Sequence, residues 1–213
     1  MTTLVLIRHA QSAANEIDVF AGHSHYPLTS LGRQQAEATA KYVAENFKID
    51  KIYSSDLLRA YETACAVSKK FSMMPIHTDA GLREIYAGSW EGMFFSDMPV
   101  KYPKEYEIWM TDISNCRCPD GESIKELFER TNEALKRIAA ENDGKTVAVV
   151  YHSTHLRSLI SYCKHGDLSR LADEKWPSNA SVSVVECDGN SFKLTLCDYS
   201  EHLTDLKSKD LKI

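Results

Sequence analysis

Four basic side chains stand at or shortly after the ends of segments predicted to be strands. They are Arg8, His9, Arg59 and His152. The apolar runs 4–7 and 147–150 are typical of buried strands, and 51–53 is a third, short strand that leads toward Arg59. In a parallel sheet the carboxyl ends of the strands lie at one edge, where ligands bind. We therefore expect the two arginines and two histidines to converge at that edge.

Two guanidinium groups side by side repel each other, so a site that gathers them is typical of anion binding. Arginine is suited to bidentate binding of phosphate, and the predicted helix start at Ser54–Asp56 adds backbone N–H groups. The sequence lacks a GxxxxGK[ST] loop, a GxGxxG loop and an Asp-rich magnesium motif. A metal-free phosphate site with two imidazoles favours one mechanism: a histidine attacks phosphorus, and water or a second acceptor then takes the phosphoryl group.

The elements that must position these residues alternate between strands and helices. Strands are predicted at 3–8, 51–53, 76–78 and 146–150, followed by a hairpin of 181–186 and 192–196. Helices are predicted at 30–47, 57–70, 123–142 and 154–163. This alternation predicts an α/β fold, a three-layer α/β/α sandwich around a mostly parallel central sheet.

The predicted helix starts carry capping residues. Thr29 or Ser30 caps the first helix, Ser54–Asp56 starts the second, and Ser123-x-x-Glu126 forms a capping box for the third. The last dozen residues are polar and are predicted to form a loose tail.

The length predicts a single domain spanning 1–213. Within it, the stretch 85–118 is rich in glycine, proline and aromatic residues, and we expect an irregular insertion that shapes a pocket over the sheet edge. A net charge of −5 without a basic run argues against nucleic acid binding. The six cysteines form no CxxC pair, and Cys116 and Cys118 alone are a weak metal signal. The N-terminal apolar run is too short for a signal peptide or a membrane span, so a cytoplasmic protein is expected.

Six short motifs, in this order, resemble the histidine phosphatase superfamily, which includes the cofactor-dependent phosphoglycerate mutases. The opening segment Leu6–Asn15 is similar to the family's Arg-His-Gly motif, with Ala10 in place of the usual glycine. The other five motifs are Pro27–Ala36, Ser54–Ala64, Leu82–Gly92, Pro119–Ser123 and Val149–His152. The resemblance covers nearly the whole chain and implies a phosphoglycerate mutase-like fold.

The resemblance implies that His9 is the nucleophile and carries the phosphoryl group as phosphohistidine. Arg8, Arg59 and His152 would bind the phosphate oxygens and stabilise the transition state. Glu84 matches the family's proton donor, and an alkoxide leaves poorly unless it is protonated. The resemblance implies neither a metal nor a cofactor.

Three further positions match places where family members contact substrate: Ser12, Asn15 and Gly22. Two differences from the family pattern lie beside the site. Ser153 stands where glycine is usual, which would narrow the pocket, and Val19-Phe20-Ala21 lacks the usual Arg and Gln. A plain solvated loop is favoured for His23 and His25, and His77, His165 and His202 are interpreted as surface residues.

A metal-independent phosphatase acting on a small phosphorylated metabolite is the favoured function. The alternative is a 2,3-bisphosphoglycerate-dependent phosphoglycerate mutase, and a phosphoprotein phosphatase or a non-catalytic binding protein is a third class. The mutases carry a longer insertion after the Glu84 region, and the segment between Glu84 and His152 here lacks their run of arginines and prolines. The aromatic insertion predicts a covered pocket, which suits a small molecule better than a protein. A homodimer is compatible with the sequence, which leaves the oligomeric state open.

Overall fold

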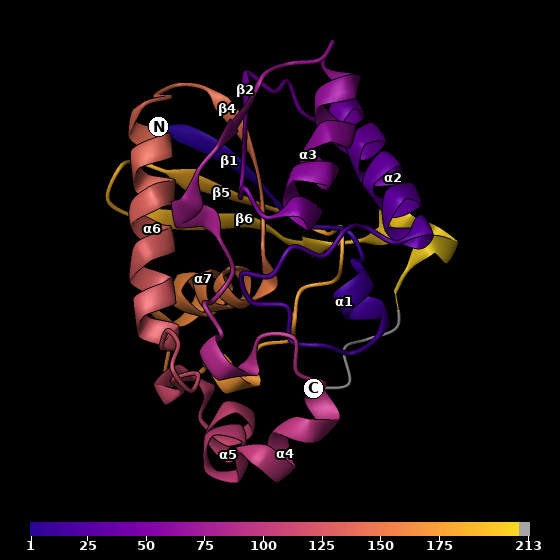
Figure 1. Ribbon diagram of the computed structural model, residues 1–213. Coiled ribbons are helices and arrows are strands. Elements are labelled where there is room, and N and C mark those ends of the chain that lie inside the picture. The colour runs from indigo at the N-terminus through magenta and orange to yellow at the C-terminus, as the bar shows by residue number, and fades with distance from the viewer. Residues whose placement is uncertain (209–213) are drawn as a thin grey trace.

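The computed structural model describes residues 1–208, which contain one six-stranded sheet (Figure 1). Its strands are β1 (Thr2–Arg8), β2 (Lys51–Ser54), β3 (Ile76–Thr78), β4 (Thr146–Tyr151), β5 (Val182–Cys187) and β6 (Phe192–Tyr199). They lie in the order β3-β2-β4-β1-β5-β6. β1 to β4 are parallel, whereas β5 runs antiparallel to β1 and β6 antiparallel to β5. The predicted mostly parallel sheet and the C-terminal hairpin are confirmed.

Helices cover both faces of the sheet. The longer ones are α2 (Ser30–Asn46), α3 (Leu58–Lys70), α6 (Ile124–Ala140) and α7 (Ser153–His165). Val5 and Ile7 pack in one apolar core with residues of α2 and α3, while Leu4 and Leu6 pack in a second core with residues of α6 and α7. Successive side chains of a strand point to opposite faces, so the continuous apolar run of β1 supplies both cores. Figure 1 shows these two helix pairs on opposite sides of the sheet, which confirms the three-layer sandwich.

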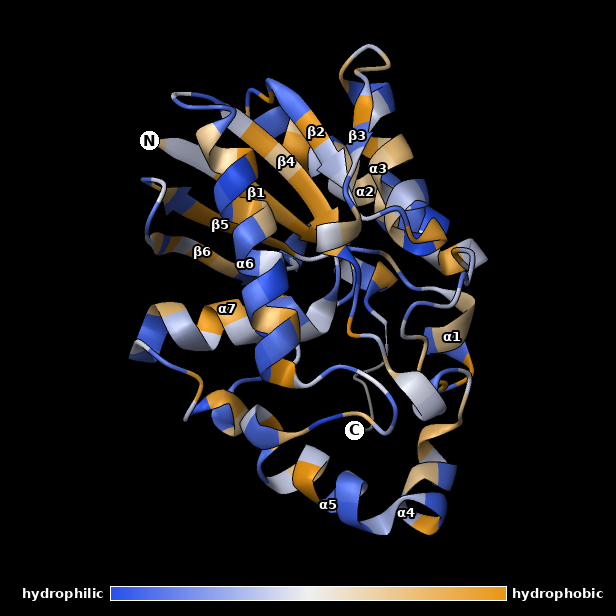
Figure 2. Ribbon diagram, turned by 60° about the vertical axis from the view of Figure 1, so that its left-hand side comes forward, coloured by the Kyte–Doolittle hydropathy of each residue, from blue (hydrophilic) through white to orange (hydrophobic). Residues whose placement is uncertain are grey.

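The colouring in Figure 2 follows the same division. β4 and β5 are hydrophobic along most of their length, as expected for strands buried on both faces, whereas α6 alternates between hydrophobic and hydrophilic residues. The predicted caps of two helices are confirmed. Thr29 accepts a hydrogen bond from the Gly32 amide at the start of α2, and Ser123 and Glu126 form the capping box of α6.

A third apolar core lies beyond the carboxyl ends of the parallel strands. The short helices α1 (Ala13–Glu16), α4 (Met98–Lys101) and α5 (Pro103–Thr111) lie in this part of the molecule, as the lower half of Figure 1 shows. Phe20, Trp90, Met98 and Trp109 are buried together there. The stretch 85–118 folds largely into this core, with short helices separated by turns.

Short 3₁₀ helices complete the described elements. They are Ala80–Leu82, Gly88–Trp90, Phe95–Asp97, Ile113–Asn115, Leu171–Asp173 and Glu201–Leu206. In residues 1–208, no helix has the length and apolarity needed to cross a membrane.

Two local predictions are wrong. α3 begins at Leu58, one residue after the predicted start, but its N-cap is Leu57 and no serine side chain caps it. The predicted loose tail contains the 3₁₀ helix Glu201–Leu206, in which Leu203 is buried because it packs into the core shared with α2. The end of that tail, 209–213, lies outside the described residues.

Candidate active site

Three neighbouring strands end level with one another at one edge of the sheet. Arg8 at the end of β1 pairs with Tyr151 of β4, and Ser54 at the end of β2 pairs with Val150 of β4. The chain that follows each strand therefore enters the same region. The structure places the expected residues there: Arg8, His9, Arg59 and His152. The rings of the two histidines lie 5.2 Å apart between centroids.

His9 is buried as a neutral imidazole with one unprotonated nitrogen. Its Nδ1 lies 2.8 Å from the carbonyl oxygen of Ala10, and because a carbonyl only accepts, this contact assigns the ring proton to Nδ1. Nε2 then accepts a hydrogen bond from Arg59 Nε at 3.3 Å. Burial, followed by the charges of Arg59 and Arg8, holds the pKa of His9 well below the ordinary histidine range. Nε2 therefore keeps its lone pair at neutral pH.

Two buried guanidinium groups lie beside His9. Arg8 and Arg59 are 2% and 1% exposed, and burial lowers the pKa of each to about 10, so both stay charged at neutral pH. Arg59 donates to the carbonyls of Gly22 (2.9 Å) and Ser24 (3.0 Å), and Arg8 donates to the carbonyl of Pro177. Their hydrogen bonds within residues 1–208 go to neutral groups, and Arg8 Nε has no partner there. Buried charge of this kind is costly without a counter-ion, which indicates an anion site.

His152 lies behind His9 and is fully buried. Its Nε2 lies 2.9 Å from the Ser55 hydroxyl, while its Nδ1 has no hydrogen-bond partner in the described part of the chain. Burial, then the charge of Arg59 and the neighbouring His9, holds the pKa of His152 well below its ordinary value. The Ser55 hydroxyl orients this imidazole and also accepts a hydrogen bond from the Leu57 amide at 3.3 Å, just before α3. Nδ1 is itself buried, and His152 is absent from the lining of the cavity beside His9.

Glu84 is the carboxyl group that lines the cavity beside His9. It is 7% exposed. Its Oε1 accepts from the Ile85 amide at 2.9 Å, and its Oε2 accepts from the Thr154 amide at 3.3 Å, at the start of α7. The sequence resemblance placed Glu84 in the site, and the structure brings it there through a turn that the neighbouring amides hold.

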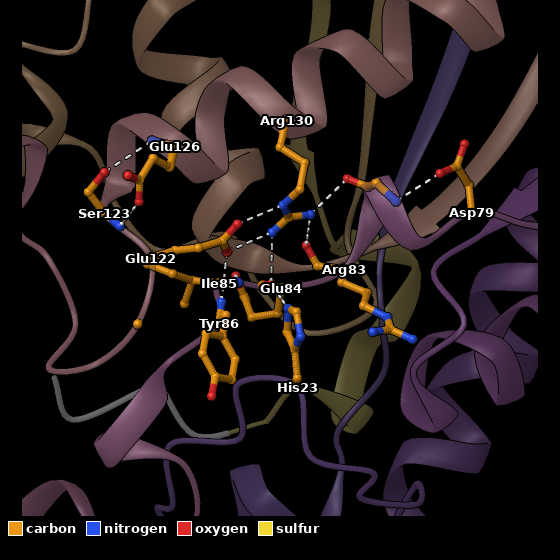
Figure 3. Close-up of polar contacts among 12 residues, drawn as sticks. His23, Asp79, Arg83, Glu84, Ile85, Tyr86, Glu122, Ser123, Glu126 and Arg130 are labelled. Carbon is orange, nitrogen blue, oxygen red and sulfur yellow. Dashed lines mark hydrogen bonds and ion pairs between the residues drawn. The ribbon is translucent and has the colours of Figure 1, made fainter.

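The main chain at Glu84 is held by a cluster of polar contacts that sequence reasoning missed (Figure 3). Arg130 of α6 donates to both carboxylate oxygens of Glu122 at 2.8 Å, to the Arg83 carbonyl at 3.1 Å and to the Glu84 carbonyl at 3.1 Å. His23 Nε2 lies 2.9 Å from the same Glu84 carbonyl. The interpretation of His23 as a solvated loop residue is therefore wrong. The sequence showed only the capping box of Ser123 and Glu126 beside Glu122, and a capping box does not predict contacts with Arg130.

Of the three residues predicted to contact substrate, two line the cavity and one does not. Asn15 and Gly22 line the cavity, whereas Ser12 is fully buried, caps α1 and is absent from the lining. Gly22 has φ +49°, and a Cβ there would lie 2.6 Å from Glu91 Oε1, so both backbone and space require glycine. Ser12 holds Asn15, because its amide and hydroxyl both donate to Asn15 Oδ1 at 3.0 Å.

Of the two residues that replace the family's usual glycine, Ser153 lines the cavity and Ala10 does not. Ser153 lines the cavity, where its hydroxyl adds a polar group. Ala10 is fully buried in the core beneath α2 and α3, away from the cavity lining. The Ala10 amide donates a hydrogen bond to the Thr63 hydroxyl at 3.1 Å and is therefore not available to bind a ligand.

The cavity beside His9 has a volume of about 60 Å³ and is open to solvent on one side. Four aromatic side chains form much of its wall: Phe20, Phe95, Trp109 and Trp176. Phe95 and Trp109 come from the stretch 85–118, which was expected to shape the pocket. Trp176 was missed, because it lies in an irregular segment between α7 and β5 that carries no motif.

The remaining histidines and cysteines lie outside the cavity lining. His202, interpreted as a surface residue, is half-buried and contacts the Thr39 hydroxyl at 2.9 Å, so that interpretation is wrong. Cys116 and Cys118 are buried, and burial raises the pKa of Cys116 to about 12. In residues 1–208, no group of three or more His, Cys, Asp and Glu side chains is placed to hold a metal ion.

A model of the histidine phosphatase superfamily (branch 1) matches residues 4–199, and the chain belongs to that superfamily. Phosphoglycerate mutase-like protein 4 of Arabidopsis thaliana is 33% identical over 204 residues, which cover 95% of this chain and 87% of that protein. Phosphoserine phosphatase 1 of Hydrogenobacter thermophilus is 29% identical over 191 residues, 88% of each chain. The solved structure of Bacillus stearothermophilus YhfR has a TM-score of 0.89 at 30% identity, covering 95% of this chain and 100% of that one. The expected family and its fold are confirmed.

Proposed function

We propose that the protein is a metal-independent phosphatase that hydrolyses a small phosphorylated metabolite through a phosphohistidine at His9. One observation carries the proposal: Nε2 of a buried, neutral imidazole faces one of two buried guanidinium groups whose hydrogen bonds within residues 1–208 go only to neutral partners. This arrangement combines a nucleophile with a binding site for a dianion. A relative named as a phosphatase supports the same activity.

The phosphate group binds where positive charge is already gathered. Arg8 and Arg59 supply two fixed charges, and donors fixed in advance stabilise the charge of the transition state without reorganising. We assign a further hydrogen bond to His152 Nδ1, which has no partner among residues 1–208 while Ser55 engages the opposite nitrogen. The bound dianion gives the two arginines the anionic hydrogen-bond partner that neither has within residues 1–208.

In the first step His9 Nε2 forms a bond to phosphorus while the bond from phosphorus to the alcohol oxygen breaks. Glu84 gives its proton to the leaving oxygen, so the product departs as a neutral alcohol. The hydrogen bond from His9 Nδ1 to the Ala10 carbonyl stabilises the positive charge that develops on the ring.

In the second step water attacks phosphorus and the bond to Nε2 breaks. Glu84, now a carboxylate, takes the proton of the attacking water, which returns both groups to their starting states. The Ile85 and Thr154 amides stabilise the carboxylate between the two steps. Each turnover thus consumes one water and releases one phosphate.

The proposal is tested with His9→Ala and p-nitrophenyl phosphate. We expect kcat to fall by about 10³-fold or more, because the nucleophile is lost. His77→Ala, an exposed position on β3, is the matched control and should keep full activity. Activity of the wild-type protein should also survive treatment with a chelator. Retained activity in His9→Ala, or loss of wild-type activity on chelation, would overturn the scheme.

We infer a cytoplasmic location from the free thiols of the protein. All six cysteines lie within the described residues and are free. Reduced thiols are typical of the cytoplasm. We also propose that 1–213 acts as one phosphatase domain whose stretch 85–118 shapes the substrate pocket, since Phe95 and Trp109 line the cavity.

A further inference from the structure

The cavity beside His9 has a charged end and an aromatic end. Its described lining includes two permanently cationic side chains, Arg8 and Arg59, and one carboxyl group, Glu84. The other lining residues, apart from His9 itself, are apolar or neutral. The chemistry of the lining therefore bears on the alcohol part of the substrate as well as on its phosphate.

Arg59 is committed to the phosphate end, and Arg8 donates to the carbonyl of Pro177. Arg59 Nε lies 3.3 Å from His9 Nε2, and its terminal nitrogens are held by the carbonyls of Gly22 and Ser24. A carboxylate or a second phosphate on the alcohol would find no further cation in the described lining, and it would meet the Glu84 carboxyl group. An uncompensated charge in a largely buried site is strongly unfavourable.

The aromatic end is a continuous surface built from three separate parts of the chain. We call Phe20, Phe95, Trp109 and Trp176 the aromatic wall. The ring of Phe20 lies 5.5 Å from that of Phe95 and 5.3 Å from that of Trp109. Trp109 in turn stacks on Trp176, with centroids 5.8 Å apart and an interplanar angle of 24°. Such a surface favours apolar and planar groups.

Trp176 is fixed in place before any ligand binds. The Arg157 guanidinium of α7 lies over its ring, 4.4 Å from the centroid. Arg157 is itself held, because it donates to the carbonyls of Glu174 at 2.7 Å and Ala172 at 3.2 Å. A wall that is already ordered loses little entropy when a ligand stacks on it.

We propose that the substrate is a monoester of a single phosphate with an uncharged alcohol whose aromatic or apolar body packs on the aromatic wall. The proposal rests on the phosphatase activity proposed above and narrows it to one class of ester. Asn15, Ser153 and Thr154 border the same cavity and can bind a neutral polar group on that alcohol. Esters that carry a carboxylate, such as phosphoserine and the phosphoglycerates, are poor substrates.

The test compares three alkyl phosphates that share a primary alkoxide leaving group: propyl, phenylpropyl and carboxypropyl phosphate. We expect kcat/KM for phenylpropyl phosphate to exceed that for propyl phosphate by about 10-fold or more, and carboxypropyl phosphate to fall below propyl phosphate. A carboxypropyl ester that matches or exceeds the phenylpropyl ester overturns the substrate class and leaves the phosphatase activity standing. Failure to hydrolyse all three esters and p-nitrophenyl phosphate overturns the proposed function itself.

Variants of the wall separate binding from folding. Trp176→Ala should bring the ratio of kcat/KM for the phenylpropyl and propyl esters close to one, whereas Trp176→Phe keeps most of it. Arg157→Met should raise KM for the phenylpropyl ester more than it lowers kcat, as expected of a positioning residue. Ile108→Ala in α5 is the control, because Ile108 is 40% exposed and outside the lining. Equal losses for both esters in Trp176→Ala would overturn the role of the wall.

Discussion

The position of Glu84 depends on Arg130, and replacing Arg130 by methionine tests that dependence. The guanidinium donates to both carboxylate oxygens of Glu122 at 2.8 Å, and to the carbonyls of Gly81 at 2.9 Å and Glu84 at 3.1 Å (Figure 3). Methionine has an unbranched side chain of similar reach but donates no hydrogen bond. The variant therefore removes the contacts that fix the turn and changes the packing little.

The magnitude follows from the exposure of the pair. The side chains of Arg130 and Glu122 are 26% and 20% exposed, so solvent screens their interaction only in part. Loss of one partner of a fully buried pair costs about 3–5 kcal/mol, and hydrogen bonds to charged groups contribute about 1.5–3 kcal/mol. For this partly exposed pair we expect Arg130→Met to lower the free energy of unfolding by about 2–4 kcal/mol. Adding Glu122→Leu should recover part of that loss, because no unpaired carboxylate then remains.

Activity should respond according to the leaving group. Proton donation by Glu84 matters for an alkyl phosphate, whose alkoxide needs a proton, and matters little for p-nitrophenyl phosphate, whose phenolate leaves unaided. In Arg130→Met we expect kcat/KM to fall by about 10-fold or more for propyl phosphate and by less than about 3-fold for p-nitrophenyl phosphate. Steady-state kinetics below the unfolding transition of the variant measure both values.

Arg137→Met is the matched control, since Arg137 lies on the same helix, pairs with Asp79 and is 53% exposed. It should leave both rates and their ratio unchanged. If Arg130→Met lowers both esters by the same factor, or leaves both unchanged while folded, Arg130 does not position the proton donor.

Three further predictions follow from single features of the structure. Burial, and secondarily a nearby cation, lowers the pKa of His155 to about 3, so in acid the unfolded chain binds a proton there that the folded chain does not. The free energy of unfolding should fall as the pH drops below about 6.5, with His155 contributing about 2 kcal/mol of the loss by about pH 5. Denaturant unfolding at about pH 6.5 and about pH 5 should show a smaller loss for His155→Gln than for the wild-type protein. An equal loss in both proteins would contradict the low pKa of His155. Gly22→Ala should lower kcat/KM as well as stability, because the new Cβ lies 2.6 Å from Glu91 Oε1 and displaces the carbonyl that holds Arg59. Gly144→Ala, also at positive φ but in open space, should lose stability alone, and an equal loss of kcat/KM in both variants would show that only backbone strain is at work. With 2,3-bisphosphoglycerate and 3-phosphoglycerate supplied together, release of phosphate should exceed formation of 2-phosphoglycerate, and the reverse result would identify a mutase.

The sheet and the convergence of its polar residues could be predicted because both depend on local signals. The apolar runs 4–7 and 147–150 identify buried strands, and parallel strands bring their carboxyl ends to one edge whatever the loops do. His9 and His152 follow those runs directly, so their meeting requires only the sheet. Capping boxes such as that of Ser123 are equally local.

The supporting contacts could not be predicted, because they join residues far apart in the chain to groups without a sequence signature. Arg130 binds carbonyl oxygens, which every residue carries. Ser55 precedes a helix, as a capping serine does, and only the folded sheet shows that it also contacts His152. Trp176 and Arg157 meet through an irregular segment whose path no periodicity encodes. Sequence motifs therefore indicated the groups that we propose to react, while the residues that hold them required the structure.

The central claim is that His9 carries the phosphoryl group during turnover, and the most direct measurement is to trap it there. The protein is mixed rapidly with p-nitrophenyl phosphate, quenched in base, where phosphohistidine is stable, digested, and analysed by mass spectrometry. We predict one phosphoryl group on the peptide that contains His9, formed within the first turnover and absent from His9→Ala. A burst of nitrophenolate without phosphorylation of that peptide, or a phosphoryl group on another residue, would contradict the account.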